Sequence, residues 1–416
     1  EISECLVGSE MCIRDRYQYL SKQDRAFMTR LVDGTIEYML QLDYIIDSFS
    51  KTKVRKMKPF IRNLLRMSVY QIKYMDAVPD SAVCNEAVKL AKRHKFAQLS
   101  GFVNGVLRNI ARNIDSVQFD TLSIRYSMPQ WIVDRFVATY GEKKAEEIFK
   151  AFHNKSTISI RTNLTRCTPD ELRAMLEAEG VTVTAVDELN YAFVISGFDY
   201  LNGLQSFRDG LFYVQDISSM LVAQTAAPKK GDYVIDVCAA PGGKSTHIAE
   251  LLQGSGHVLA RDLTDNKVDM IEENIERHGL NNMSAEVWDA TVPDADSAGK
   301  ADILICDLPC SGLGVLGRKK DIRYKMTPES VDELAALQRQ ILDTVHTYVK
   351  PNGVLVYSTC TIDEAENEDN VRWFIEKHPE FELDKNFAEG TGMEQILPGE
   401  HGSDGFFIAR FIKSKL

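Results

Sequence analysis

The segment YVIDVCAAPGGKSTHIAELL, residues 233–252, decides how the second half of the chain folds. Its first five residues, apolar apart from Asp236, predict a short buried strand. Small residues and a proline then form a loop, and the apolar spacing beyond them predicts a helix. Such a loop lets the backbone approach a ligand closely at the carboxyl end of the strand. The segment therefore predicts the ligand-binding loop of an α/β domain.

The rest of the chain from Gly231 repeats this alternation of strand and helix. We expect strands at 233–237, 257–261, 284–288, 302–306 and 354–358, and an edge strand in FFIARFIK, 406–413. Helices are expected from Gly243, from Thr264, after Glu366, and over 328–350 with Thr327 as the N-cap. This order predicts a parallel sheet covered by helices on both faces, in one domain spanning 231–416.

Three kinds of ligand compete for the glycine-rich loop. A phosphate-binding Walker loop needs glycine at position 238, where Cys238 stands, and Pro241 removes an amide that would cradle phosphate. The dinucleotide fingerprint G-x-G-x-x-G is absent. S-adenosylmethionine carries no phosphate and needs a tight loop together with carboxylates for its hydroxyl and amino groups.

Carboxylates follow three successive predicted strands, which favours S-adenosylmethionine. Each carboxylate alone is more often a helix cap than a ligand, but three at one sheet edge are hard to explain as caps. The candidate cofactor-binding residues are Cys238, Ala239, Ala240, Pro241, Gly242, Gly243, Lys244, Asp262, Asp289 and Asp307.

Two cysteines stand at predicted strand ends beside this loop. Buried cysteine usually behaves as a small core hydrophobe, which suits Cys84, Cys167 and Cys306. Cys310 in DLPCSG and Cys360 in STCT instead lie in polar or glycine-rich turns at the ligand-binding edge. No C-x-x-C pair or neighbouring histidine supplies four zinc ligands, so we expect no metal.

Two smaller modules precede this domain. Residues 17–115 show helical periodicity and predict an all-helical domain, whereas 116–230 mix helix and strand and predict a small α+β module. The helical part carries a net charge of +8, while the chain as a whole carries −11. Its basic segment, KTKVRKMKPFIRNLLR at 51–66, is either a solvated helix face or a surface that contacts phosphates.

Composition narrows the class of protein. The 416 residues are 44% hydrophobic, as in ordinary globular proteins, and no apolar run reaches the roughly 18 to 20 residues of a membrane span. Eight scattered cysteines are typical of reduced thiols, so we expect a cytoplasmic protein, and we expect it to be a monomer. Residues 1–16 fit neither a signal peptide nor the following helical pattern, and are expected to be foreign to the fold.

The motifs CAAPGGK (238–244), DLPCSG (307–312) and STC (358–360), in this order, resemble the ribosomal and transfer RNA cytosine-5 methyltransferase family. LVDGTIEYMLQLD (31–43), the stretch at 64–92 and GFVNGVLRNIAR (101–112) resemble the helical domain shared with the antitermination factor NusB. The combination resembles the family members that act on 16S ribosomal RNA. It implies a Rossmann-like methyltransferase domain, a NusB-like helical RNA-binding domain and a small RNA-binding module between them. The resemblance is lost at the start, where the first NusB-like helix is missing or replaced.

The resemblance also implies a mechanism in which S-adenosylmethionine donates a methyl group to carbon 5 of cytosine. Cys360 would be the nucleophile that adds to carbon 6, and Cys310 would assist loss of the carbon 5 proton and release of the enzyme. Asp307 would bind the cytosine edge, with Lys244 beside the base or cofactor. Arg161, Gln215 and Asp216 also match the family without a role that the sequence reveals. The alternatives are the same chemistry on transfer RNA and a catalytically silent RNA-binding or antitermination factor.

Overall fold

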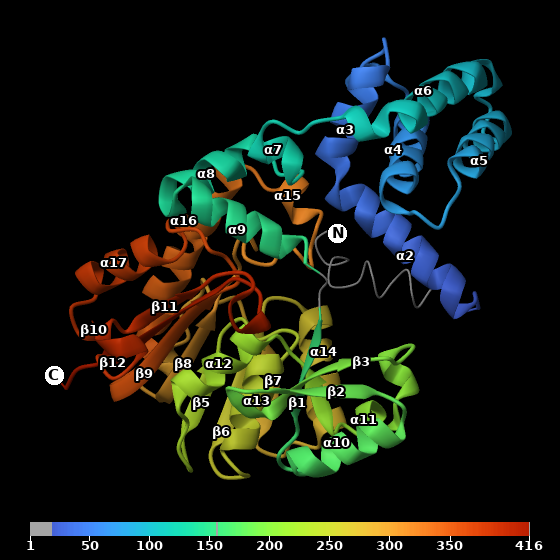
Figure 1. Ribbon diagram of the computed structural model, residues 1–416. Coiled ribbons are helices and arrows are strands. Elements are labelled where there is room, and N and C mark those ends of the chain that lie inside the picture. Colours follow the sequence, from blue (N-terminus) through green and yellow to red (C-terminus); the bar gives the residue numbers. More distant parts are fainter. Residues whose placement is uncertain (1–18, 155–156, 416) are drawn as a thin grey trace. The chain divides into compact units, whose positions relative to one another are not determined.

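The computed structural model describes residues 19–154 and 157–415, which form two compact units (Figure 1). The helical unit comprises Glu1–His153 with Arg318–Lys325, and the catalytic unit comprises Asn154–Gly317 with Met326–Leu416. The segment 1–16, which we expected to be foreign to the fold, lies outside the described residues. The domain boundaries at 115 and 230 stay predictions.

The helical unit is built from amphipathic helices. Leu42, Ile46, Leu65 and Leu107 lie at the centre of an apolar core and are fully buried. Because apolar residues recur at helical spacing, the helices between Lys22 and Asn113 each present one face to this core. The helices are α2 Lys22–Glu37, α3 Met39–Phe49, α4 Pro59–Tyr74, α5 Asp80–Arg93, α6 Ser100–Asn113, α7 Leu122–Arg125, α8 Gln130–Tyr140, α9 Glu142–Phe152 and α15 Ile322–Lys325, with 3-10 turns η1 Val54–Lys56, η2 Ala97–Leu99 and η3 Ile114–Ser116.

A small antiparallel sheet opens the catalytic unit. Its strand order is β2-β3-β1-β4, with β1 Ile158–Thr162, β2 Thr182–Val186, β3 Leu189–Ser196 and β4 Phe212–Val214. The helix α10 Pro169–Ala178 starts with a capping box between Thr168 and Glu171. The short elements η4 Leu201–Gly203 and α11 Gln205–Arg208 lead into β4. This module is the expected mixture of helix and strand.

The large sheet has eight strands in the order β10-β12-β9-β8-β5-β6-β7, with β11 paired to β12. Its centre is parallel, from β9 through β8, β5 and β6 to β7. The strands are β5 Tyr233–Asp236, β6 His257–Asp262, β7 Met283–Val287, β8 Ala301–Asp307, β9 Val349–Thr359, β10 Phe381–Leu383, β11 Met393–Ile396 and β12 Phe406–Lys413. A parallel centre of this kind is the Rossmann-like arrangement expected from the sequence.

Helices cover both faces of this sheet (Figure 1). Apolar residues of α16 Pro328–Val345 and α17 Glu368–Lys377 pack with Leu304 and Leu355 on one face. Residues of α12 Ile217–Ala226, α13 Gly243–Leu251 and α14 Asp265–His278 pack with Ile303 and Val356 on the other. Adjacent residues of the same strand thus serve opposite faces, which is why these strands are apolar almost throughout. The turns η5 Ala295–Ser297, η6 His346–Tyr348, η7 Ala388–Gly390 and η8 Glu400–Gly402 complete the unit.

Two expectations about the C-terminal region were wrong. The tail at 406–413 is not an edge strand, because β12 pairs with β9 on one side and with β10 and β11 on the other. The helix expected over 328–350 ends at Val345 and passes through η6 into β9. The elements behind these errors are β10, β11 and η6. Each has three or four residues, which is too short to show a periodic pattern in the sequence. Among the described residues, no helix is long and apolar enough to cross a membrane.

Candidate active site

The glycine-rich loop joins β5 to α13 at the carboxyl edge of the large sheet. Gly242 stands at the N-cap of α13 with φ of +103°, a conformation that glycine adopts without strain. The amide of Ala239 donates to the Arg261 carbonyl at 2.8 Å and that of Ala240 to Asp262 Oδ2 at 2.9 Å, so the loop is fixed to the end of β6. Ligand-binding residues on such a loop are held by the sheet rather than by the ligand.

The three predicted carboxylates lie at the carboxyl ends of β6, β7 and β8, but they differ in their present partners. Asp262 is nearly buried and accepts from two backbone amides, with Lys267 Nζ 3.0 Å from its second oxygen. Asp289 is exposed, and its Oδ1 caps its own turn through Thr291; these hydrogen bonds lower the pKa of Asp289. Asp307 faces Lys244. Each carboxylate has lone pairs to spare for a ligand.

Negative charge dominates the electrostatics of this loop. Burial raises the pKa of the Cys238 thiol well above its usual range, and the charges of Asp262, Asp236 and Asp307 raise it further. Burial also raises the pKa of Asp236, which is 1% exposed, to about 7. A loop in this setting suits a ligand with an ammonium or sulfonium group and disfavours phosphate. The residues present therefore fit S-adenosylmethionine.

Lys244, in the first turn of α13, and Asp307, at the end of β8, form an ion pair. Lys244 Nζ lies 2.7 Å from Asp307 Oδ2, and Ser358 Oγ donates to Asp307 Oδ1 at 2.8 Å. Burial lowers the pKa of Lys244, but the Asp307 carboxylate, together with the charges of Asp236 and Cys360, more than offsets this and raises the pKa above its usual value. The pair thus fixes one cation and one anion at the sheet edge, and Ser358 leads directly into the Cys360 turn.

The two predicted cysteines meet beside this ion pair. Cys310 follows β8 and Cys360 follows β9, and their Sγ atoms lie 3.2 Å apart. The loop after Cys310 packs closely on the end of β9: Gly314 N donates to the Cys360 carbonyl, and a Cβ on Gly314 would lie 2.2 Å from the Gly405 carbonyl oxygen. Only glycine at position 314 allows this approach.

The two sulfur atoms have different charged neighbours. The hydrogen bond with Cys360 and burial raise the pKa of Cys310 well above its usual range, and the charges of Cys360 and Glu366 add to the effect. On the other side, a negatively charged Cys360 contributes to the raised pKa of Lys244. A Coulomb interaction acts equally on both partners, so the Lys244 ammonium favours negative charge on Cys360.

Sequence reasoning missed Glu366, which is fully buried behind Cys310. Its carboxylate accepts from the Ser311 amide at 2.9 Å, from the Ser311 hydroxyl, and from Gln338 Nε2 at 2.9 Å. In the sequence Glu366 stands within IDEAENEDN, an acidic stretch that suggests only the exposed start of a helix. No pattern in the sequence distinguishes this one carboxylate from its neighbours.

The contacts of Arg161 were also not predictable. Arg161 is 1% exposed on β1, and its guanidinium donates to the Gly243 carbonyl at 2.8 Å and to Glu250 at 2.9 Å. Gln215 accepts a further bond from Arg161, and Asp216 is the N-cap of α12. Arg161 therefore connects the small sheet to the first turn of α13, directly after the ligand-binding loop.

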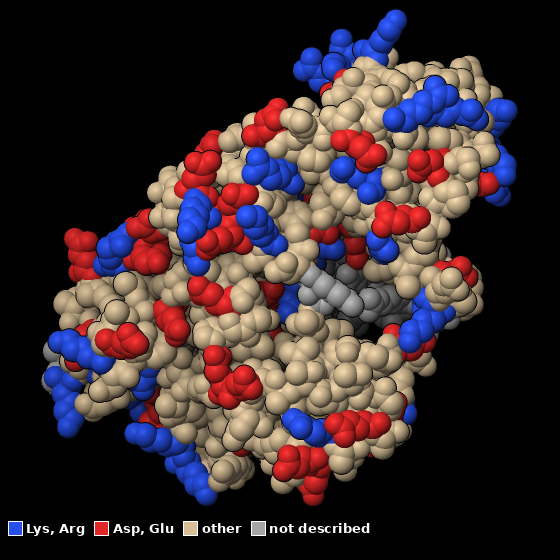
Figure 2. Space-filling model, viewed as in Figure 1, with Lys and Arg blue, Asp and Glu red and all other residues tan. Residues whose placement is uncertain are grey.

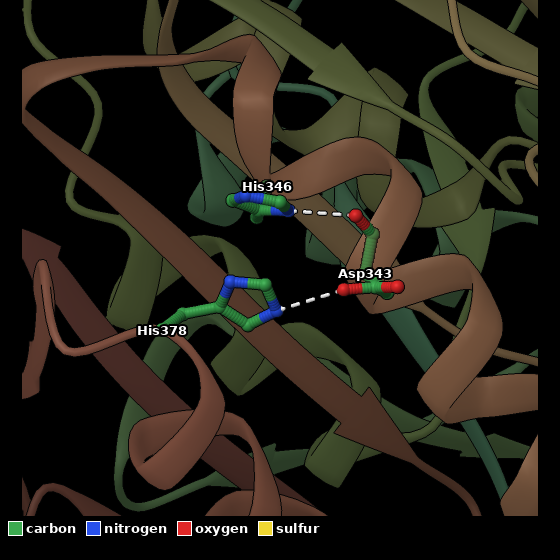
Figure 3. Close-up of side chains that lie close together, drawn as sticks. All are labelled: Asp343, His346 and His378. Atoms are coloured by element: carbon green, nitrogen blue, oxygen red, sulfur yellow. Dashed lines mark hydrogen bonds and ion pairs between the residues drawn. The ribbon is translucent and has the colours of Figure 1, made fainter.

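A second cluster of titratable groups lies away from this site. Asp343, His346 and His378 stand near the end of α16 and the end of α17, on the side where β9 begins rather than where Cys360 follows it (Figure 3). Such residues can bind a divalent metal. Here the imidazole rings lie tilted by 37° with centroids 4.0 Å apart, and the Lys377 ammonium lies 2.9 Å from the Asp343 carboxylate. We therefore assign no metal to the cluster.

Comparison with known proteins identifies the family. Residues 223–412 match the family described as 16S rRNA methyltransferase RsmB/F, residues 8–112 match the NusB family, and residues 128–198 match the ferredoxin-like domain of RsmF/B-like methyltransferases. The "Probable ribosomal RNA small subunit methyltransferase B" of Bacillus subtilis (strain 168) is 38% identical, across 95% of this chain and 92% of the relative. The chain belongs to the RsmB/F family. Similarly described relatives from Synechocystis and Salmonella paratyphi A are 34% and 31% identical, again over 95% of the chain.

Solved structures agree with membership of the RsmB/F family. The crystal structure of PH0851 has a TM-score of 0.82 at 26% identity and covers 97% of this chain and 93% of its own. That of NSun6 from Pyrococcus horikoshii with SFG has a TM-score of 0.62 at 24% identity, over 69% of this chain and 99% of its own, which shows a shared fold. As an RsmB/F family member, the protein is an S-adenosylmethionine-dependent RNA methyltransferase.

Proposed function

We propose that this protein transfers a methyl group from S-adenosylmethionine to carbon 5 of a cytosine in 16S ribosomal RNA, through a covalent bond between Cys360 and the base. The observation that carries the proposal is the pair of cysteine sulfurs, 3.2 Å apart, beside the Lys244–Asp307 ion pair. Carbon 5 of cytosine is a weak nucleophile, and addition of a thiolate to carbon 6 turns it into a strong one. A methyltransferase that alkylates nitrogen or oxygen has no need of two thiols.

The unequal surroundings of the sulfurs support Cys360 as the nucleophile. The cation of Lys244 favours the thiolate of Cys360, while Cys310 is held as a thiol by Cys360, burial and Glu366. The Cys360 thiolate would add to carbon 6, with Asp307 hydrogen-bonded to the cytosine edge as charge develops on the ring. S-adenosylmethionine supplies an electrophilic methyl group when bound, and carbon 5 takes it.

The same electrostatics suggest how the adduct is resolved. Once the bond from Cys360 to carbon 6 forms, its sulfur no longer carries negative charge, so the main cause of the raised Cys310 pKa is removed. Cys310 can then lose its proton to solvent and, as a thiolate, accept the proton that carbon 5 loses. The carbon 5–carbon 6 double bond re-forms as the carbon–sulfur bond breaks, and the released Cys360 thiolate regains a thiol neighbour. Because the two sulfurs share one proton, their titrations belong to the pair.

Recognition of RNA would rest in part on the basic segment of the helical unit. Lys51, Lys53, Arg55, Lys56 and Lys58 are all exposed, and they lie in the connection between α3 and α4 rather than on a helix face. Figure 2 shows Lys and Arg side chains gathered at this end of the unit. Arg66 differs, since both its Nε and Nη2 lie 2.6 Å from the Asp43 carboxylate. Five exposed cations suit a phosphate backbone, and the target cytosine must be unstacked for Cys360 to reach it.

Mapping of 5-methylcytosine in cells with and without this enzyme tests the proposal. We expect one cytosine of 16S ribosomal RNA to lose its methyl group on deletion and to regain it from the wild-type gene but not from Cys360→Ser. Loss of a methyl group from transfer RNA alone would establish the alternative substrate. Unchanged 5-methylcytosine in both RNAs would overturn the cytosine-5 assignment.

A further inference from the structure

One buried carboxylate, that of Glu366, binds the loop that carries Cys310. Glu366 lies between β9 and α17, is 0% exposed, and binds both the backbone amide and the hydroxyl of Ser311, the residue after Cys310. Gln338 on α16 donates to the same carboxylate and also to the Pro309 carbonyl at 2.9 Å. The residues on both sides of Cys310 are thus tied to Glu366 directly or through Gln338.

Besides binding this loop, the Glu366 side chain affects Cys310 through its charge. Burial raises the pKa of Glu366 above its usual value, and the two hydrogen bonds from Ser311 and the one from Gln338 oppose this rise without cancelling it. Cys360 and Glu366 disfavour the thiolate of Cys310, and the Gly312 amide favours it. The buried Tyr357 hydroxyl, which also bonds the Glu366 carbonyl, is a further titratable group within range of Cys310. The cation of Lys244, paired with Asp307, interacts with Cys360.

We propose that Glu366 is a positioning residue for methyl transfer, which holds the Cys310 loop in place and directs negative charge in the sulfur pair away from Cys310 and onto Cys360. The inference rests on the proposed function for its catalytic meaning. The asymmetry of the thiols is a property of the resting protein and is measured without RNA or cofactor. Without this carboxylate, the two sulfurs compete for the one proton, and part of the enzyme holds its thiolate on the wrong cysteine.

Glu366→Gln is the decisive variant, because it removes the charge at nearly constant shape. The Gln amide oxygen can accept from the Ser311 amide, and the amide nitrogen can donate to the Ser311 hydroxyl, so both hydrogen bonds with Ser311 can persist. Glu366→Asp keeps the charge on a shorter side chain, and Ser311→Ala keeps the charge while removing one hydrogen bond. A structural role alone predicts that all three variants behave alike.

The experiment is alkylation of the thiols with iodoacetamide across pH 6 to 10, with each cysteine followed by peptide mass spectrometry. The proteins are the full-length chain and its variants, in a Cys360→Ser background as well, so that Cys310 titrates without its neighbour. In that background, we expect Glu366→Gln to lower the pH midpoint for Cys310 labelling by about one unit or more. With both cysteines present, labelling should shift from Cys360 towards Cys310.

Equal Cys310 midpoints with and without the Glu366→Gln substitution would overturn the proposal, as would an equal shift in Ser311→Ala. If Glu366→Gln does not fold, as judged by its thermal transition, Glu366→Asp decides: its Cys310 midpoint must match that of the protein with Glu366 intact, and a lowered midpoint would contradict a role for the charge. These readouts concern thiols alone. They can succeed even if 5-methylcytosine mapping refutes the proposed reaction, and they can fail while that reaction stands.

Discussion

The sulfur atoms of Cys310 and Cys360 lie 3.2 Å apart, although the residues follow different strands and are separated by 50 positions in the chain. Their surroundings are not equivalent, since Lys244 faces Cys360 and Glu366 lies behind Cys310. Two thiols at this distance share a proton, and the fixed charges around them decide which sulfur is the nucleophile. The mechanism proposed for this enzyme follows from that asymmetry.

The Cys310→Ala variant should accumulate a covalent enzyme–RNA adduct with ordinary RNA. The addition by Cys360 remains possible, but the proton on carbon 5 has no thiolate to accept it. Denaturing gel electrophoresis of enzyme mixed with RNA and S-adenosylmethionine measures the adduct, and Cys84→Ala, in the buried core of the helical unit, is the matched control. Product release at the wild-type rate would exclude the role of Cys310.

Arg161 should support cofactor binding from a distance. Its guanidinium donates hydrogen bonds to the Gly243 carbonyl and to the Glu250 carboxylate inside the protein. Arg161→Met leaves the buried Glu250 carboxylate beside His278, whose Nδ1 lies 3.5 Å away but whose pKa is lowered by burial, so the loss of the Arg161 cation costs about 3 to 5 kcal/mol of unfolding free energy. We expect S-adenosylmethionine to bind at least about tenfold more weakly, because the first turn of α13 loses its anchor, an effect of about 1.4 kcal/mol.

The double variant Arg161→Met, Glu250→Leu separates these effects. Removing both charges should recover much of the stability, as measured by urea unfolding, because no unpaired charge remains. Cofactor affinity, measured by calorimetric titration, should stay weak because the Gly243 contact is still missing. Recovery of affinity together with stability would show that Arg161 acts on folding alone.

Asp236 gives a prediction for pH. Burial raises its pKa to about 7, so the folded protein favours the protonated carboxyl, whereas the unfolded chain ionises near its ordinary value of 3.8. The contribution of Asp236 to stability is therefore lost progressively as pH rises from about 4 to 7, by at most about 4 kcal/mol. Asp236→Asn mimics the protonated form. Its stability relative to wild type, from urea unfolding, should increase between pH 5 and pH 8; a constant difference would contradict the raised pKa.

The basic segment should contribute to RNA affinity through phosphates. Lys53, Arg55 and Lys56 are exposed, and their combined replacement by alanine should reduce the slope of log affinity against log salt by about 2 to 3. Filter binding of a 16S ribosomal RNA fragment at several salt concentrations measures this slope. Replacement of the exposed Lys229 and Lys230, in the turn that precedes β5, is the control and should leave it unchanged. An unchanged slope in the triple variant would make the segment a solvated surface only.

The central strands were predictable because parallel strands buried on both faces are continuous apolar runs. β5, β6, β7 and β8 lie within one or two residues of their predicted positions. The start of β9 was missed, since Pro351 and Gly353 suggest a turn, and the register between β8 and β9 is indeed irregular there. β10 and β11 were missed because a strand of three or four residues leaves no period.

Some residues of the site were predictable from the sequence and others were not. Lys244, Asp307, Cys310 and Cys360 stand at strand ends, where topology alone brings side chains together, so motif and spacing suggested them. Glu366 and the partners of Arg161 depend on packing between elements distant in the chain, such as β1 with α13 and α17 with the Cys310 loop. Their burial is decided by tertiary contacts, and no local pattern carries it.

The most direct test of the account is adduct formation with RNA that carries 5-fluorocytidine at the target position. In this base, fluorine replaces the hydrogen on carbon 5, and a base cannot remove fluorine as it removes a proton. The final elimination is therefore blocked, and any thiol bound to carbon 6 stays bound. Wild-type enzyme with S-adenosylmethionine should give a denaturation-resistant adduct, and peptide mass spectrometry should locate the RNA on Cys360. An adduct of equal yield in Cys360→Ser, or one mapped to Cys310, would contradict the assignment of Cys360 as the nucleophile.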